Sequence, residues 1–163
     1  MSKQLETLTE MLKDRGHEEL DIEHTSEAII VRSETIFCII TKDDKINVAF
    51  LRKTFEDNEE YDHFIIVYPT TITPSAKSAI NPNKRVEFYT YPELSFNITK
   101  HFLVPKHCIE TGDIKYKHTE IPVILSIDPI VKWYDFPMGS VIKVIRRDES
   151  VAYRYVKYSE NIK

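Results

Sequence analysis

Five consecutive apolar residues, Phe64-Ile65-Ile66-Val67-Tyr68, constrain the fold of this chain more than any other feature. A run this short and this rich in β-branched side chains is typical of a strand, and its lack of alternation indicates that both faces are covered. Two further runs, at residues 28–31 and 35–40, have the same β-branched character. A strand covered on both faces needs helices above and below it, so the sequence predicts an α/β fold with a mixed or partly parallel sheet.

Helical patterns lie between these runs. Near the start of the chain, apolar residues recur at intervals of three and four: Leu5, Leu8, Met11 and Leu12. Gly16 follows as a natural stop, so we expect a helix over about residues 2–15. A less regular pattern predicts a second helix over about residues 47–59. Further along, Thr73 can cap a short helix whose first position is Pro74.

The composition changes near residue 97, where the predicted elements become shorter and less regular. Beyond a strand at residues 86–89, we expect a loop as far as Pro105, a helix at residues 128–134, and strands at residues 140–145 and 151–157. The turn before the first of these strands is residues 137–139. The chain is therefore predicted to hold two modules, residues 1–97 and 98–163.

Composition places the chain among ordinary soluble proteins. Its 163 residues are 42% hydrophobic and 29% charged, and no apolar stretch is long enough to cross a bilayer. The N-terminus lacks the apolar block of a signal peptide, and the two cysteines, Cys38 and Cys108, lie far apart. We therefore expect free thiols, a buried Cys38, and a cytosolic or nuclear protein that is not secreted.

Charge is unevenly distributed along the chain. Residues 1–62 carry eight basic and sixteen acidic side chains, whereas residues 63–163 carry fourteen and ten. The second part can therefore face nucleic acid or an acidic partner, while the first part repels phosphate. A mixed solvated surface explains the modest positive excess equally well.

The chain offers little that would hold a cofactor or a metal. His101, His107, Cys108 and His118 are usable ligands, but they lack the paired spacing of a closed zinc site. Only three glycines occur, so the glycine-rich loops that cradle nucleotides are missing. We expect no cofactor, no metal and no small-molecule ligand.

A diverged metal-dependent nuclease is the sharpest enzymatic alternative. Asp43-Asp44-Lys45 provides an acidic pair and a lysine beside a strand, as such enzymes require. The same residues fall where a polar hairpin turn is expected, and turns are rich in Asp and Lys. The turn is the preferred interpretation.

Two further groups could contact nucleic acid. The predicted helix start at Thr73 offers free backbone N–H groups, to which Ser75 and Lys77 would add donors, although simple helix capping explains it as well. A basic and aromatic group follows over the last two strands: Lys143, Arg146, Arg147, Tyr153, Arg154, Tyr155 and Lys157. This group can bind phosphates and bases or form a protein interface, and the mostly apolar first strand favours the interface.

Six segments together resemble a known family. They are residues 10–16, 64–68, 72–76, 97–107, 128–134 and 139–146, and the resemblance ends near Tyr153-Arg154. In this order and spacing they resemble the shared fifth subunit of the eukaryotic RNA polymerases and its archaeal counterpart. The resemblance covers nearly the whole chain.

The resemblance implies a nuclease-like N-terminal α/β jaw module without an active site, near downstream DNA. It also implies a small mixed α/β C-terminal module that docks on the largest polymerase subunit. The DNA-facing candidates are Thr73, Pro74, Ser75 and Lys77. The candidates for assembly are Val104, Pro105, Lys106, His107, Asp128, Pro129, Gly139, Lys143, Arg146, Tyr153 and Arg154.

We therefore expect a non-catalytic polymerase subunit that contacts other subunits and, weakly, duplex DNA, and that makes no contact with membranes. A free-standing interaction adaptor is a further alternative. The segment at residues 108–120 is shorter than its counterpart in the family, and Met138 stands where a basic residue is usual. A shortened copy of this kind is expected of a large DNA virus, so the predicted location is the nucleus, or a virion or cytoplasmic virus factory.

Overall fold

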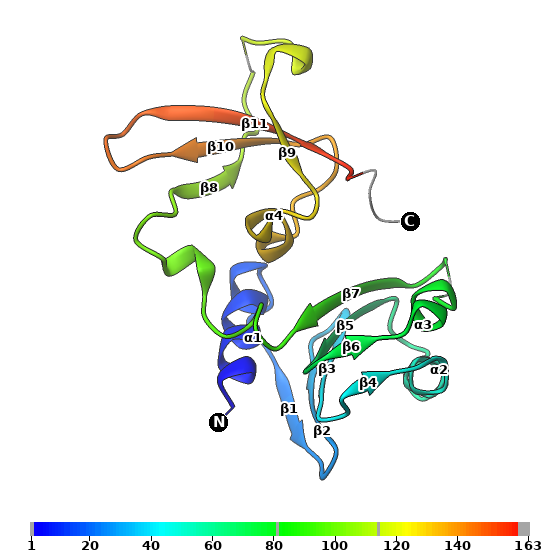
Figure 1. The fold of residues 1–163 in the computed structure, drawn as a ribbon. Helices are drawn as coiled ribbons and strands as arrows, with labels where there is room; N and C mark the ends of the chain where they lie inside the picture. Colours follow the sequence, from blue (N-terminus) through cyan, green and yellow to red (C-terminus); the bar gives the residue numbers. More distant parts are fainter. Residues whose placement is uncertain (1, 81, 114, 160–163) are drawn as a thin grey trace. The chain divides into compact units, whose positions relative to one another are not determined.

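The computed structural model describes residues 2–80, 82–113 and 115–159 (Figure 1). The chain forms two compact units, residues 1–96 and 97–163. Each unit is built on a large sheet of its own.

The first unit is built on a five-stranded mixed sheet, of order β1-β2-β3-β5-β7. Its strands are β1 (Asp21–His24), β2 (Ala28–Arg32), β3 (Ile36–Thr41), β5 (His63–Tyr68) and β7 (Arg85–Thr90). Strand β2 runs antiparallel to both β1 and β3, whereas β3, β5 and β7 are parallel. The predicted mixed sheet is confirmed, and β5 lies between two partners with five of its six residues buried.

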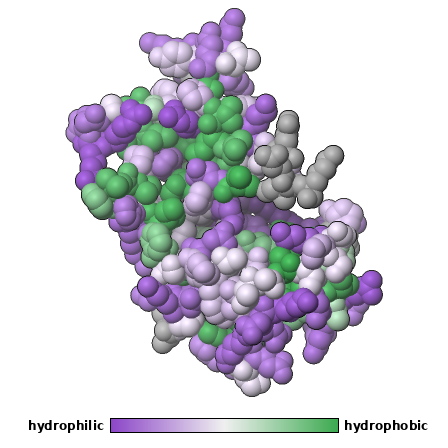
Figure 2. Space-filling view, viewed as in Figure 1, coloured by the Kyte–Doolittle hydropathy of each residue, from purple (hydrophilic) through white to green (hydrophobic). Residues whose placement is uncertain are grey.

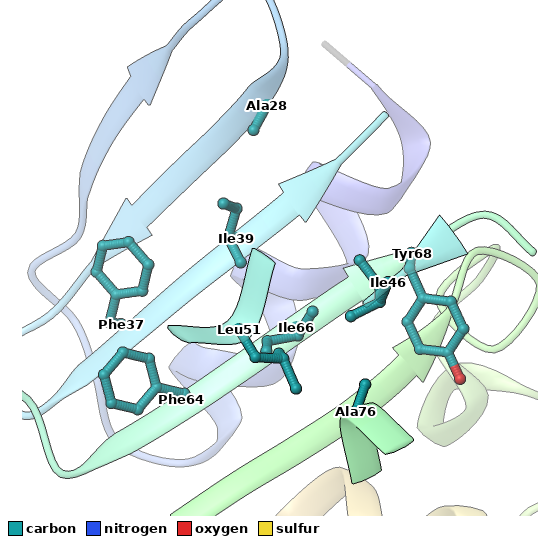
Figure 3. Close-up of a cluster of buried hydrophobic side chains, with 9 residues drawn as sticks. All are labelled: Ala28, Phe37, Ile39, Ile46, Leu51, Phe64, Ile66, Tyr68 and Ala76. Carbon is teal, nitrogen blue, oxygen red and sulfur yellow. The ribbon is translucent and has the colours of Figure 1, made fainter. Parts of the chain in front are cut away.

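Helices cover both faces of this sheet, as the uninterrupted apolar strand requires. Helix α1 (Lys3–Asp14) lies behind the sheet in Figure 3. Helices α2 (Val48–Glu56) and α3 (Pro74–Ser78) lie on the other face, where the pieces that carry Leu51 and Ala76 are drawn in front of the sheet. The short strands β4 (Lys45–Ile46) and β6 (Thr71–Ile72) pair with each other and lead directly into α2 and α3. The buried side chains of this front layer are Ala28, Phe37, Ile39, Ile46, Leu51, Phe64, Ile66, Tyr68 and Ala76 (Figure 3).

Local sequence explains where α1 begins and ends. The Ser2 side chain accepts a hydrogen bond from the Leu5 N–H at 3.2 Å, which satisfies one of the free donors of the first turn. The helix ends at Asp14 and is capped by Arg15, and Gly16 follows with a φ of 94°, a conformation that glycine adopts without strain. The helix predicted over residues 2–15 is confirmed.

A charged cluster ties α1 to the sheet. The Arg15 guanidinium donates to both carboxylate oxygens of Glu87, at 2.9 and 2.8 Å, and to the Tyr89 hydroxyl at 3.1 Å. His63 Nε2 donates to the same carboxylate at 2.6 Å. The Arg15 and Glu87 side chains are only 4% and 15% exposed, so the pair exchanges most of its water for these bonds.

Neighbouring groups control the acidity of this cluster. Burial by itself would raise the pKa of Glu87, but the hydrogen bonds from His63 and Arg15 and their positive charge lower it well below its usual range. Burial raises the pKa of Cys38 strongly, so this thiol stays protonated. The predicted buried core cysteine is confirmed, and both cysteines are free.

The second unit contains a four-stranded sheet of order β8-β10-β11-β9. Its strands are β8 (Lys106–Ile109), β9 (Val123–Leu125), β10 (Val141–Ile145) and β11 (Val151–Lys157). Strands β10 and β11 form an antiparallel hairpin, β8 runs antiparallel to β10, and β9 runs parallel to β11. Helix α4 (Pro129–Tyr134) packs its apolar side chains with this sheet in one buried cluster.

Two short helical turns, η1 (Ile98–Lys100) and η2 (His118–Glu120), complete this unit. The predicted helix at residues 128–134 and both predicted C-terminal strands are confirmed. The loop predicted as far as Pro105 contains η1, and strands β1, β4, β6, β8 and β9 were not predicted. No helix of the described residues is long and apolar enough to span a membrane.

Candidate functional site

Helix α4 organises one side of the second unit. The Asp128 carboxylate accepts a hydrogen bond from the Ile130 N–H at 2.9 Å, and Pro129 occupies the first helical position. The helix ends at Asp135 in a left-handed conformation, with a φ of 55°. Asp128 and Pro129 therefore contribute to the start of this helix, independently of any role in docking.

His107 lies beside this helix start on the core face of the sheet. It pairs with Val144, whose side chain is buried against α4. Its Nδ1–H donates to the Pro105 carbonyl oxygen at 2.8 Å, since a carbonyl can only accept. Burial lowers the pKa of His107, the hydrogen bond to Pro105 and the charge of Asp128 oppose this shift, and the charge of Arg154 adds to it. His107 is therefore held by the loop before β8 and lies within the electrostatic influence of Asp128 and Arg154.

The turn before β10 depends on glycine. Gly139 has a φ of 80°, and its N–H donates to the Val156 carbonyl oxygen at 3.0 Å. A Cβ at this position would lie 3.6 Å from the Tyr155 hydroxyl, an ordinary contact, so the conformation rather than crowding requires glycine. The predicted turn at residues 137–139 is confirmed by the hydrogen bond from the Ser140 N–H to the Pro137 carbonyl oxygen at 3.2 Å.

The predicted basic and aromatic group does not form one patch. Lys143 and Tyr153 are directly paired and share the face opposite α4, whereas Arg154 pairs with the buried Ile142 on the α4 face. Arg146 and Arg147 lie beyond the end of β10, in the hairpin turn. Alternation along the two strands divides the group between both faces and the turn.

On the face opposite α4, the segment before η2 covers part of the sheet. The rings of Tyr116 and Tyr153 lie 6.3 Å apart, and the His118 ring stacks on Tyr155 at 5.0 Å. The Lys143 ammonium lies 3.6 Å from the Glu110 carboxylate. The aromatic side chains of β11 are thus partly engaged within the unit.

The turn of the β10–β11 hairpin and the segment leading into β8 enclose a surface hollow. Its volume is about 380 Å³, and it is lined by Phe102, Leu103, Val104, Pro105, Arg146, Arg147 and Asp148. Three predicted assembly residues, Val104, Pro105 and Arg146, meet here. Phe102 and Leu103 were not predicted as site residues from the sequence, because two adjacent apolar residues are equally typical of a buried segment.

In the first unit, the four DNA-facing candidates form one surface at the start of α3. The Thr73 hydroxyl accepts from the Ala76 N–H at 3.2 Å and lies 3.2 Å from the Ser75 hydroxyl oxygen. Pro74, Ser75 and Lys77 are exposed, and Thr73 is partly buried. The predicted capping of this helix by Thr73 is confirmed, and the contact with DNA stays a prediction.

The acidic pair at residues 43–44 lies in an exposed connection between β3 and β4, and Lys45 begins β4. The prediction of a hairpin turn at these residues is wrong. A hairpin would require β3 and β4 to pair with each other, whereas β3 pairs with β2 and β5, and β4 pairs with β6. Within the described ranges, no three His, Cys, Asp or Glu side chains gather as a metal site would require.

The four possible metal ligands of the second unit have separate contacts. The ring of His101 lies 5.1 Å from that of Phe102, and His107 bonds Pro105. The Cys108 thiol points toward the Lys143 carbonyl oxygen at 4.0 Å, and His118 stacks on Tyr155.

Comparison with known proteins shows which proteins this chain is similar to. Residues 96–158 match the model of the RNA polymerase Rpb5 C-terminal domain. The RPABC1 subunit of DNA-directed RNA polymerases I, II and III from Caenorhabditis briggsae is 29% identical over 175 residues, which cover 97% of this chain and 82% of that protein.

Two other relatives carry the same name. The Caenorhabditis elegans protein is 31% identical over 77% of this chain and 65% of its own length. The Dictyostelium discoideum protein is 29% identical over 93% of this chain and 92% of its own length. These matches span both units of the chain. The resemblance predicted from the sequence is therefore confirmed: this chain is similar to Rpb5, the shared fifth subunit of the eukaryotic RNA polymerases.

Proposed function

We propose that this chain is a non-catalytic subunit of a multisubunit DNA-dependent RNA polymerase. The observation that carries the proposal is the match of both units, in order, to relatives named as shared polymerase subunits. The acidic residues at positions 43 and 44 are exposed and, among the described residues, belong to no cluster of three possible metal ligands, so they lend no support to the nuclease alternative.

The second unit would dock on the largest subunit, and the first would support downstream duplex DNA. Support for docking comes from the exposed apolar residues of the second unit, which Figure 2 shows as green areas over its sheet and the chain leading into β8. Support for a weak DNA contact comes from the exposed Ser75 and Lys77 at the start of α3, within an acidic unit that would not bind phosphate tightly by itself.

If the chain belongs to a cellular polymerase, its location is the nucleus. A viral enzyme assembled in the cytoplasm would place the chain in the virion or virus factory instead. Staining of the tagged chain together with a large polymerase subunit would distinguish these sites.

Gel filtration of extract from the native source tests the proposed function. The 19.2 kDa chain should elute with a complex of polymerase size. Elution as a free monomer would contradict the proposal.

A nuclease assay tests the alternative. Purified protein with Mg²⁺ or Mn²⁺ should leave plasmid DNA intact. Cleavage that the Asp44→Ala variant abolishes would establish the nuclease instead.

A further inference from the structure

The hollow between the β10–β11 turn and the segment before β8 has an apolar side that the fold does not use. Phe102 is 63% exposed and Leu103 is 71% exposed, although they are adjacent and both large. Val104, the next residue, packs against the core and anchors the segment. Adjacent exposed apolar side chains on a firmly anchored segment are typical of a protein interface.

The opposite side of the hollow carries two guanidinium groups. The Arg147 guanidinium lies over the Phe102 ring, 5.4 Å from its centroid, and donates to the Phe102 carbonyl oxygen. Arg146 donates to the Ser150 hydroxyl at 3.3 Å. Because each guanidinium has five N–H donors, both retain donors for a further acceptor.

Hydrogen bonds from Ser150 and the positive charge of Arg146 lower the pKa of Asp148, the one acidic residue that lines the hollow. The Asp148 carboxylate accepts from the Ser150 N–H at 3.0 Å and from the Ser150 hydroxyl at 2.6 Å, which closes the hairpin turn. The hollow therefore combines an apolar surface with an excess of positive charge. An occupant that complements it carries a large apolar side chain next to a carboxylate.

We propose that this hollow binds an extended segment of a neighbouring polymerase subunit, in which an acidic residue flanks a large apolar one. The apolar side chain would cover Phe102 and Leu103, and the carboxylate would pair with Arg146 and Arg147. This inference rests on the proposed function and names the surface and the chemistry of the docking. Nucleic acid is the less suitable occupant, because the Arg147 guanidinium already lies over the Phe102 ring and Leu103 has no ring on which a base can stack.

Recovery of the polymerase through tagged variants tests the surface. Replacing Phe102 and Leu103 together with serine, or Arg147→Glu alone, should reduce the recovery of the large subunits at least tenfold. Matched controls are Ile127→Ser, an exposed apolar residue outside the hollow, and Lys115→Glu, an exposed lysine in the segment between β8 and η2. Both controls should stay within twofold of the unchanged chain.

The outcomes distinguish a failure of the proposed function from a failure of the proposed docking surface. If the unchanged chain recovers no polymerase, the proposed function fails. If it recovers polymerase and the Phe102, Leu103 and Arg147 variants do so equally well, only the docking surface is overturned. Melting curves of the variants should match that of the unchanged chain, because these side chains are exposed; a lost transition would assign Phe102 and Leu103 to folding and overturn their docking role.

Cross-linking tests the acidic partner directly. The Arg147→Lys variant keeps the positive charge and supplies an amine that a carbodiimide can join to a nearby carboxylate. We expect an amide between residue 147 and an Asp or Glu of another subunit, beside a large apolar residue. Cross-links confined to this chain would overturn the proposal. It would also be overturned if the polymerase that contains the Arg147→Glu variant kept all of its subunits and lost only its binding to DNA.

Discussion

The guanidinium of Arg15 and the carboxylate of Glu87 form a bidentate pair at 2.9 and 2.8 Å, although 72 residues separate them in sequence. Arg15 caps the end of α1, and Glu87 lies in β7 at the edge of the first sheet. The pair therefore fastens the first helix to the last strand of this unit.

Removing one member of this pair should be costly. Arg15→Ala leaves the Glu87 carboxylate buried with His63 and Tyr89 as its remaining partners, so we expect a loss of about 3 kcal/mol in the free energy of unfolding. The matched control is Arg32→Ala, whose partners Asp21 and Glu23 are exposed, with an expected loss below about 1 kcal/mol. Equal losses in urea denaturation would contradict a special role for Arg15.

The same cluster predicts acid sensitivity. The folded-state pKa of Glu87 is lower than its unfolded value, so its contribution to stability is fully present above the ordinary carboxyl range and is lost as the pH falls through that range and below it. Unfolding free energies measured between pH 7 and pH 3 should fall less steeply for Glu87→Gln than for the unchanged chain. Parallel curves would show that other carboxylates cause the acid sensitivity.

The three glycines should respond differently to alanine. Gly16 and Gly139 have positive φ values, so each substitution should cost about 1 kcal/mol through backbone strain. Gly112 has no such conformation, and a Cβ there would meet only the end of the flexible Glu110 side chain at 3.2 Å. Gly112→Ala should therefore change stability by less than about 0.5 kcal/mol. Thermal unfolding of the three variants would reveal this order or contradict it.

The cap of α4 provides a fourth prediction. Asp128→Ala removes the acceptor of the Ile130 N–H and should cost about 1 kcal/mol of unfolding free energy. Asp128→Asn keeps an acceptor and should retain most of the stability. The control is Asp113→Ala, an exposed position of the same unit. An unchanged stability of the Asp128→Ala variant would show that the cap contributes nothing.

Local patterns predicted most of the elements. The uninterrupted run in β5, the spacing in α1 and the Thr73-Pro74 start of α3 each depend on neighbours in sequence, which the chain displays directly. Strand β1 was missed because its four residues are all exposed and its pairing with β2 alone makes it a strand. Strands β8 and β9 are equally short and have no alternating pattern that would identify them.

Contacts between distant residues could not be predicted. Nothing in the sequence joins Arg15 to Glu87, or brings Arg147 over the ring of Phe102. The division of the basic and aromatic group follows from strand alternation, so its two faces could have been predicted from the sequence. The position of the hollow depends on the register of β8 against β10, which the sequence does not reveal.

Affinity purification of the tagged chain from its native source, with mass spectrometry and an RNA synthesis assay on the eluate, tests the central claim most directly. A polymerase subunit should recover the two large polymerase subunits in equal ratio with itself, in an eluate that synthesises RNA on a DNA template. Recovery of the chain alone, or with partners unrelated to transcription, would contradict the proposed function.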